Sequence, residues 1–303
     1  MLIILLALFF VLVALVSGNN LSACTGAIIG GRITSKRMGI GIAIAGYVAG
    51  LALEGTFLKR GVNALMPVEN NLLLSEAFAI AIAVFLLAHK FRVPLSLTIV
   101  FTGMLVGLGF GMGMNVNVLF IALIAAFWVV VPLVSLFTMK PLLHYFTRKL
   151  RKGHLWKRVG QIKLWLVAVS FFTSFTLGAN TLGLLFASIP VQYWYKLTIA
   201  VLAIFIGSIF LSEGELRRLG NEIVSIRYLN ALLSQAVSAL EVEAATLLGV
   251  PLSNTQTFTA SLYGVGYSYK ARLMQRKPAY AIVSIWLASV LLSFLVAFML
   301  ARL

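Results

Sequence analysis

The chain of 303 residues is 61% hydrophobic and only 11% charged, whereas an average soluble domain carries about a quarter charged residues. This composition excludes an ordinary soluble enzyme and indicates a polytopic membrane protein. The net charge of +16 comes from basic residues that flank apolar segments, so we expect it to orient the chain in a bilayer, with no nucleic-acid partner. The single cysteine, Cys24, excludes an internal disulfide and a cysteine-based metal site.

Apolar segments of about the length that crosses a bilayer follow one another along the chain. The first has no basic start and no suitable small-residue cleavage site, so we expect a retained span and not a signal peptide. The predicted segments are about 2–31, 38–57, 72–89, 93–111 and 117–138, then 164–190, 194–211, 228–248, 251–268 and 279–301.

The most polar stretch, residues 140–163, carries eight Lys and Arg residues and divides the chain into two halves. We expect a transmembrane repeat at 1–139, a basic cytoplasmic linker at 140–163 and a second transmembrane repeat at 164–303. Because each half has an odd number of predicted segments, the second repeat would be inverted relative to the first.

The positive-inside rule gives the expected orientation. With the 140–163 linker in the cytoplasm, most of the 24 Lys and Arg residues fall on the cytoplasmic side. The prediction is therefore a multi-pass protein of the cytoplasmic membrane with both termini outside.

One polar and glycine-containing sequence occurs in both halves. VPLSLTIVFTGMLVGLG at 93–109 recurs as VPLSNTQTFTASLYGVG at 250–266, with ten identical positions among seventeen. Proline and hydroxyl residues at the start of each copy suit the first turn of a helix. Charge counting leaves open whether each copy spans the membrane or forms a re-entrant hairpin.

Glycine and asparagine interrupt two long apolar segments, at SGNNLSACTG (17–26) and TLGANTLG (176–183). Both residues are unfavourable inside a helix, so we expect a break at membrane depth that exposes the N-terminus of a half-helix. Such an end attracts anions. The alternative is that small residues serve close helix packing, which is our interpretation of Gly103 and Gly107.

These motifs resemble those of the inorganic phosphate transporter (PiT) family, the phosphate permeases. Its first signature, G-x-N-D followed by A-N, aligns with residues 17–20 and 178–181, and its V-V-G-T-R sequence aligns with 28–32. Its second signature, G-[IV]-P-V-S-x-T-H, aligns with both VPLS stretches. The resemblance implies an all-α carrier of two inverted repeats, about five segments each, with broken helices or re-entrant hairpins and ion sites at the midplane.

The chain departs from the family at the acidic positions. Asn20 and Thr181 replace the two signature aspartates, and Ile99 and Gln256 replace the two histidines of the second signature. Because Na⁺ prefers anionic oxygen ligands, the family's sodium coupling does not carry over directly. We expect no cofactor, with Na⁺ or H⁺ as the open choice of coupling cation.

A site without acids can still hold a tetrahedral oxyanion through amides, hydroxyls and backbone N–H groups. We expect no catalytic residue and no metal ligand. The predicted substrate-binding residues are Asn19, Asn20, Ser22, Thr25, Ser96, Thr98, Asn180, Thr181, Ser253, Asn254 and Thr255. Glu241 and Glu243 lie inside a predicted span and are candidates for proton coupling, one of them at most facing the pathway.

These features predict a secondary transporter that moves inorganic phosphate by alternating access. Sulfate or another tetrahedral oxyanion is the alternative substrate, and a non-transporting regulatory or structural membrane protein is the alternative class. An enzyme is not expected, because the sequence shows no pattern of nucleophile, base or metal ligands. The predicted partners are the oxyanion and the lipid bilayer, with a homodimer left open.

Overall fold

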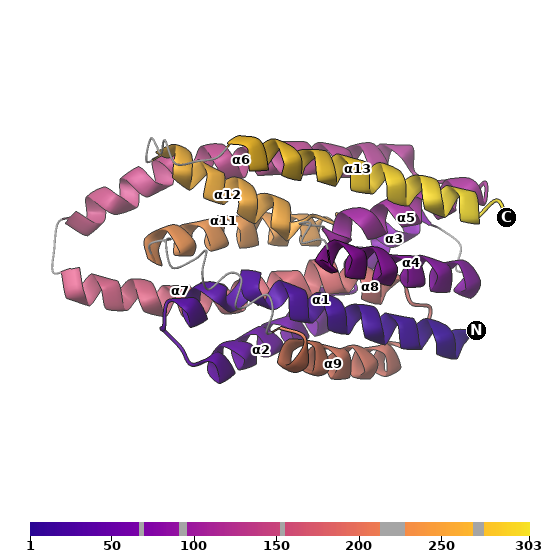
Figure 1. Cartoon of the computed structure of the whole chain (residues 1–303), viewed down its shortest axis with the longest axis horizontal. Coiled ribbons are helices and arrows are strands. Elements are labelled where there is room, and N and C mark those ends of the chain that lie inside the picture. Colours follow the sequence, from indigo (N-terminus) through magenta and orange to yellow (C-terminus); the bar gives the residue numbers. More distant parts are fainter. Residues whose placement is uncertain (67–69, 91–95, 152–154, 213–227, 269–275) are drawn as a thin grey trace.

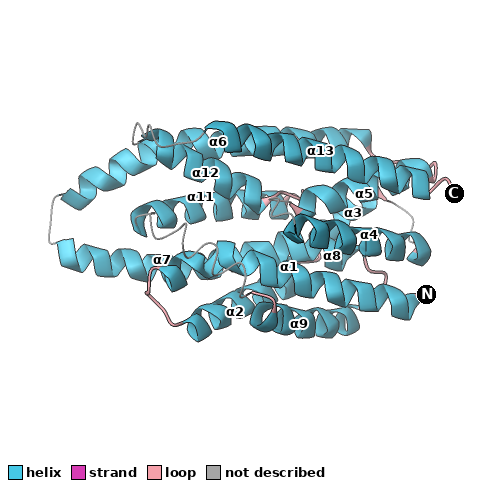
Figure 2. Cartoon of the chain, viewed as in Figure 1, coloured by secondary structure: helices cyan, strands magenta, loops and turns pink. Residues whose placement is uncertain are grey.

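The structure is a computed structural model that describes residues 1–66, 70–90, 96–151, 155–212, 228–268 and 276–303. Helices form all of the regular structure within these ranges (Figure 2). Six of them are long and apolar enough to cross a membrane. The prediction of an all-α polytopic membrane protein is confirmed.

Each of the ten predicted segments corresponds to helical structure. The first half contains α1 (Leu2–Gly30), α2 (Lys36–Glu54), α3 (Leu58–Leu65), α4 (Asn71–Lys90), α5 (Leu97–Gly111) and α6 (Val118–Arg151). The second half contains α7 (Leu155–Leu177), the π-helical turn η1 (Gly178–Leu182), α8 (Gly183–Ser188), α9 (Tyr193–Phe210), α11 (Tyr228–Leu247), α12 (Asn254–Ser268) and α13 (Arg276–Leu300). Hydropathy missed α3, because its eight residues are too few to cross a bilayer.

The basic linker 140–163 is not the loop that its polarity suggested. Residues 140–151 continue α6, and residues 155–163 form the beginning of α7. Both termini lie at one end of the molecule, and the junction of α6 with α7 lies at the other (Figure 1). This arrangement fits an odd number of crossings between the N-terminus and the linker.

Helices of the first half of the chain pack against helices of the second half. Helix α1 packs along α9, and α2 packs along α7. Helix α5 packs along α13, and α12 packs along α6. Each pair therefore joins one helix from each half. The inverted relation of the halves stays a prediction. Pairing of helices from different halves is the arrangement that such an inversion would produce.

Glycines bring several of these pairs into close contact. A Cβ on Gly103 would lie 2.9 Å from the carbonyl oxygen of Val290, and a Cβ on Gly111 would lie 2.8 Å from that of Phe298. Gly103 and Gly107 therefore serve helix packing, as predicted, because side chains there would force α5 away from α13.

The predicted break in the first apolar segment is wrong. Helix α1 runs without interruption through 17–26. Gly18 serves packing instead, because a Cβ there would lie 2.7 Å from the carbonyl oxygen of Gly207 on α9. The hydroxyls of Ser17, Ser22 and Thr25 donate to carbonyl oxygens three or four residues earlier, which a continuous helix permits.

The second predicted break is a local widening of the helix. Residues 178–182 form the π-helical turn η1 between α7 and α8. Single π-helical turns shift the side chains that follow them and are frequent at functional sites. The sequence GANTL is thus irregular, as predicted, without being unwound.

The VPLS helices belong to two opposed hairpins. Helices α4 and α5 both lie toward the end of the molecule that holds the termini, and α11 and α12 both lie toward the other end (Figure 1). Helices α5 and α12 have 15 residues each, which corresponds to about 22 Å against a hydrocarbon core of about 30 Å. These lengths favour the re-entrant alternative, which stays a prediction.

Candidate anion-binding site

The tips of the two hairpins meet near the middle of the molecule. The hydroxyl of Ser96 donates to the hydroxyl of Ser253 at 2.8 Å. These two serines occupy equivalent positions in the repeated VPLS sequence, 157 residues apart. Both side chains are buried. The two copies of the repeated motif therefore contact each other through the same serine.

The same two serines stand at the starts of α5 and α12. Ser96 is the N-cap residue of α5, and the Ser253 hydroxyl accepts a hydrogen bond from the Gln256 N–H in the first turn of α12 at 3.3 Å. The first-turn N–H groups of a helix have no partner within the helix, and the helix dipole is positive there. Two such ends face one another, which is a favourable environment for an anion.

Asn180 connects η1 to the tip of the second hairpin. Its side-chain amide donates to the hydroxyl of Thr246 and to the carbonyl oxygen of Val250, each at 3.0 Å. Its carbonyl oxygen accepts from the Leu252 N–H, also at 3.0 Å. Asn180 is fully buried, so this single side chain holds the backbone on which Ser253 stands.

Thr98 and Thr181 bring η1 to the first hairpin as well. Their hydroxyl oxygens lie 3.3 Å apart, and both side chains are buried. Five of the predicted residues therefore form one neutral polar cluster, hereafter the tip cluster. They are Ser96, Thr98, Asn180, Thr181 and Ser253.

The remaining predicted residues of the second hairpin lie beside the tip cluster. The side-chain oxygen of Asn254 accepts a hydrogen bond from the Ser238 hydroxyl at 2.6 Å, which ties α12 to α11. Ser238 also lies 2.5 Å from the hydroxyl of Thr257. Thr255 is half-buried in the first turn of α12. Asn254 thus stabilises the hairpin itself.

The four predicted residues of α1 are not joined to the tip cluster by a hydrogen bond in the described structure. Ser22 and Thr25 are buried and bond to the backbone of their own helix. Asn19 and Asn20 are half-buried on the same helix. Their contribution to substrate binding stays a prediction.

Sequence reasoning missed Gln235, which attaches α11 to α1 at this level. Its side-chain amide donates to the carbonyl oxygens of Ala23 and Cys24, each at 3.0 Å, and its oxygen accepts from the Ser170 hydroxyl at 3.4 Å. No motif contains Gln235. A buried amide inside an apolar segment is the signal that could have found it.

The sequence and the fold were compared with those of known proteins. The sequence model of the phosphate transporter family matches residues 151–297, which include η1, α12 and most of the tip cluster. The second half of this chain matches the phosphate transporter family.

Two similar proteins match nearly the whole length of this chain. The sulfate permease CysP of Bacillus subtilis is 24% identical over 99% of this chain and 86% of its own length. A protein of Methanocaldococcus jannaschii that is provisionally named a phosphate permease, MJ0630, is 23% identical over 98% of this chain and 96% of its own. A solved structure titled as the sodium-dependent phosphate transporter has a TM-score of 0.79 at 20% identity, and the match covers 99% of this chain and 98% of that one. This last likeness shows that the fold is shared.

The two candidate coupling residues, Glu241 and Glu243, have different neighbours. The carboxylate of Glu241 accepts a hydrogen bond from the Ser135 hydroxyl of α6. The carboxyl group of Glu243 lies near that of Glu54, the last residue of α2, and one buried oxygen of each has no hydrogen-bond partner among the described residues. Sequence reasoning did not identify the proximity of Glu54 and Glu243, because these residues lie far apart in the chain.

Proposed function

We propose that the chain is a secondary transporter that moves inorganic phosphate across the cytoplasmic membrane by alternating access. The observation that carries the proposal is the hydrogen bond between Ser96 and Ser253, since it brings two helix N-termini to one place from opposite ends of the molecule. Opposed hairpins that share one site are the geometry by which a carrier can open that site to either side in turn.

In this proposal the oxyanion replaces the hydrogen bond between the two serines. Each hydroxyl would then donate to an oxygen of the anion, together with first-turn N–H groups of α5 and α12. The tip cluster carries no charge of its own, so no counter-ion is needed to relieve repulsion from a carboxylate. Its residues are buried in the structure, which fits a closed state between two open ones.

Sulfate is the second candidate substrate. The specific observation in its favour is the neutral donor set, because sulfate presents only acceptor oxygens to hydroxyl and N–H donors. The similarity to a sulfate permease over 99% of this chain supports the same alternative. Hydrogen phosphate differs by one O–H group, which needs an acceptor such as a serine hydroxyl.

The test is uptake of labelled phosphate into proteoliposomes that contain the full chain. We expect saturable uptake, and unlabelled phosphate should compete with it about tenfold more effectively than sulfate, which corresponds to about 1.4 kcal/mol of preference. Stronger competition by sulfate would establish the second candidate instead. Absence of uptake under every ion gradient would favour a non-transporting membrane protein.

The orientation proposed for this carrier follows the positive-inside rule. The 140–163 segment would lie in the cytoplasm, with both termini outside. In support, the α1–α2 connection contains Arg32 and leads into Lys36 and Arg37 at the start of α2, and it lies toward the same end of the molecule as the end of α6 and the beginning of α7 (Figure 1).

We propose further that H⁺ and not Na⁺ is the coupling cation, and that Glu243 with Glu54 carries it. Asn20 and Thr181 leave no acid at the signature positions. A hydrogen bond between two carboxyl groups needs one proton, because an ionised carboxylate can only accept. Glu243 precedes Thr246, a partner of Asn180, by three residues on α11, so the pair is close to the tip cluster.

Replacing Glu243 by glutamine is expected to remove stimulation of uptake by a proton gradient. With about one pH unit across the vesicle membrane, stimulation of wild-type uptake can reach about tenfold, and Glu243→Gln should show none. Initial uptake rates with and without the gradient provide the measurement. Glu241→Gln is the matched control and should keep the stimulation, since its carboxylate bonds to Ser135 on α6. Equal stimulation of Glu243→Gln and wild type would contradict the assignment.

A further inference from the structure

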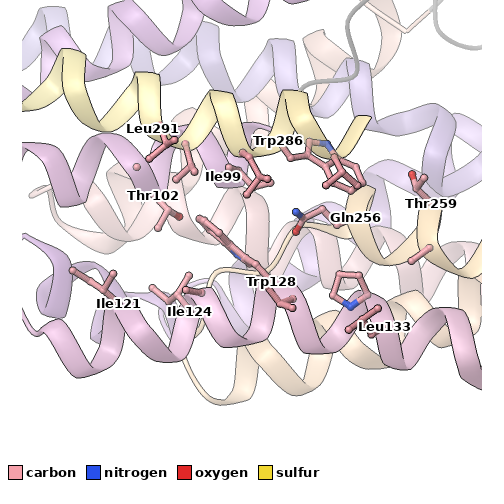
Figure 3. A pocket seen from close by; sticks show the side chains of 18 of the residues that line it. Ile99, Thr102, Ile121, Ile124, Trp128, Leu133, Gln256, Thr259, Trp286 and Leu291 are labelled. Atoms are coloured by element: carbon pink, nitrogen blue, oxygen red, sulfur yellow. The ribbon is translucent and has the colours of Figure 1, made fainter. Parts of the chain in front are cut away.

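A large apolar cavity lies between the two hairpin helices α5 and α12 and the two outer helices α6 and α13. Its volume is about 950 Å³, within the range of roughly 300–1,000 Å³ that small-molecule sites occupy. Among the described residues, no charged side chain lines it. Figure 3 looks into this cavity and shows side chains from all four helices on its walls.

The cavity is built from equivalent positions of the repeated sequence. Each lining residue of α5 has a counterpart 157 positions later in the lining of α12, for example Ile99 with Gln256, Thr102 with Thr259 and Val106 with Tyr263. The cavity is therefore a product of the duplication and lies where the halves meet. The two sides differ in chemistry, because α5 has an isoleucine at the position where α12 has a glutamine.

Three polar atoms in this apolar wall have no hydrogen-bond partner among the described residues. They are the Thr102 hydroxyl oxygen, the Gln256 side-chain oxygen and the Trp286 indole nitrogen. The three side chains are 2%, 6% and 9% exposed. A buried polar group without a partner costs about 1–3 kcal/mol, so a bound molecule that supplies partners is favoured. Trp128, on the same wall, already donates its indole N–H to the carbonyl oxygen of Pro251 at 3.0 Å.

The side of the cavity formed by α6 and α13 is accessible from the surface. These are the least buried of the six candidate spans. Val129, Leu287 and Leu291 each line the cavity and are 62% exposed. Apolar exposed residues on a membrane-spanning helix face lipid, so a molecule dissolved in the bilayer can enter from the side.

We propose that this cavity binds one uncharged membrane lipid that carries a free hydroxyl group, such as an acylglycerol. The hydroxyl both accepts from the Trp286 N–H and donates to the Gln256 oxygen, and the acyl chain fills the apolar volume. A phospholipid headgroup is disfavoured because the wall offers no charged partner. The bound lipid contacts the first turn of α12 at Gln256, the residue that follows Thr255.

Quenching of tryptophan fluorescence by a brominated lipid tests the proposal. Trp156→Phe, Trp165→Phe and Trp194→Phe together leave Trp128 and Trp286, which both line the cavity. The full chain is reconstituted in phosphatidylcholine vesicles, and a monoacylglycerol with a dibrominated acyl chain is added. The methyl ester of the same brominated fatty acid serves as the matched probe without a hydroxyl.

We expect saturable quenching, half-complete at a mole fraction of the monoacylglycerol about tenfold lower than that of the methyl ester. Gln256→Met should reduce this preference to below about threefold. Thr259→Val, at the position equivalent to Thr102, should leave it unchanged. If Gln256→Met does not fold, Trp286→Phe carries the test, because it removes the proposed N–H donor and leaves Trp128 as the fluorescent reporter.

Quenching that rises linearly and equally with both probes would overturn the proposal, since it would show contact with bulk lipid only. A preference that survives Gln256→Met, or Trp286→Phe where that variant carries the test, would also overturn it. Absence of quenching by either probe, in a protein that elutes as a dimer, would assign the cavity to a second copy of the chain instead.

Discussion

Replacing Asn180 by alanine is expected to lower the rate of phosphate uptake at least about a hundredfold. The variant leaves the Leu252 N–H, the Val250 carbonyl oxygen and the Thr246 hydroxyl without the partner they share. Each buried group that loses its partner costs about 1–3 kcal/mol, so the tip of the second hairpin no longer holds Ser253 against Ser96. Initial rates of labelled phosphate uptake in proteoliposomes provide the measurement.

Thr246→Val is the matched control for Asn180→Ala. It removes one of the three hydrogen bonds and leaves the two to the hairpin backbone. The uptake rate should fall by about fivefold to tenfold. An Asn180→Ala protein that folds and transports at the rate of Thr246→Val would show that Asn180 does not position the tip.

Introducing the family's acid at one signature position, Thr181→Asp, is expected to abolish uptake in the absence of sodium, with a loss of about a hundredfold or more. Thr181 is 4% exposed and lies 3.3 Å from Thr98. A carboxylate there would be buried without a counter-ion and would repel the oxyanion. Uptake into sodium-free vesicles measures the effect.

Thr181→Val separates the charge from the loss of the hydroxyl. This variant removes the contact with Thr98 without adding charge and should keep uptake within about tenfold of wild type. Asn20→Asp should have a smaller effect than Thr181→Asp, because Asn20 is half-buried on α1. Sodium-free uptake by Thr181→Asp at the wild-type rate would contradict a neutral anion site.

The sequence was sufficient for the membrane segments and for the duplicated hairpins. Hydropathy located eight of the ten segments to within a few residues, because a bilayer forces long apolar runs into helices. It missed the polar end of α6 and the polar start of α7, which extend beyond the apolar runs. The VPLS repeat predicted that Ser96 and Ser253 share one site, and the structure brings their hydroxyls to 2.8 Å. Motif identity works here because equivalent residues of a duplicated element meet where the two copies meet.

The sequence was misleading about α1. Gly18 and Asn19 predicted a broken helix from local propensity, but tertiary packing decides the outcome, since Gly18 allows the backbone of α9 to approach. The same residue types in η1 do disturb the helix, where Asn180 bonds outside it. Local propensity cannot distinguish these cases, because the deciding partners lie on other helices.

The contacts of Gln235, Glu54 and Trp286 lay beyond prediction for a related reason. Each has an environment made by helices distant in sequence, and none stands in a motif. Gln235 bonds to α1 from α11, and Glu54 of α2 lies near Glu243 of α11. Polarity inside an apolar segment marks such residues, but only the packing of helices identifies their partners.

Cross-linking of the two hairpin tips tests the shared site most directly. In a Cys24→Ser background, Ser96→Cys and Ser253→Cys place two thiols where hydroxyls now lie 2.8 Å apart, and a protease site inserted between residues 151 and 155 lets the halves separate on a denaturing gel. We predict that mild oxidation joins the halves and stops uptake, that reduction restores it, and that phosphate slows the cross-linking. Halves that separate after oxidation, or cross-linking that phosphate does not slow, would contradict an anion site between the two tips.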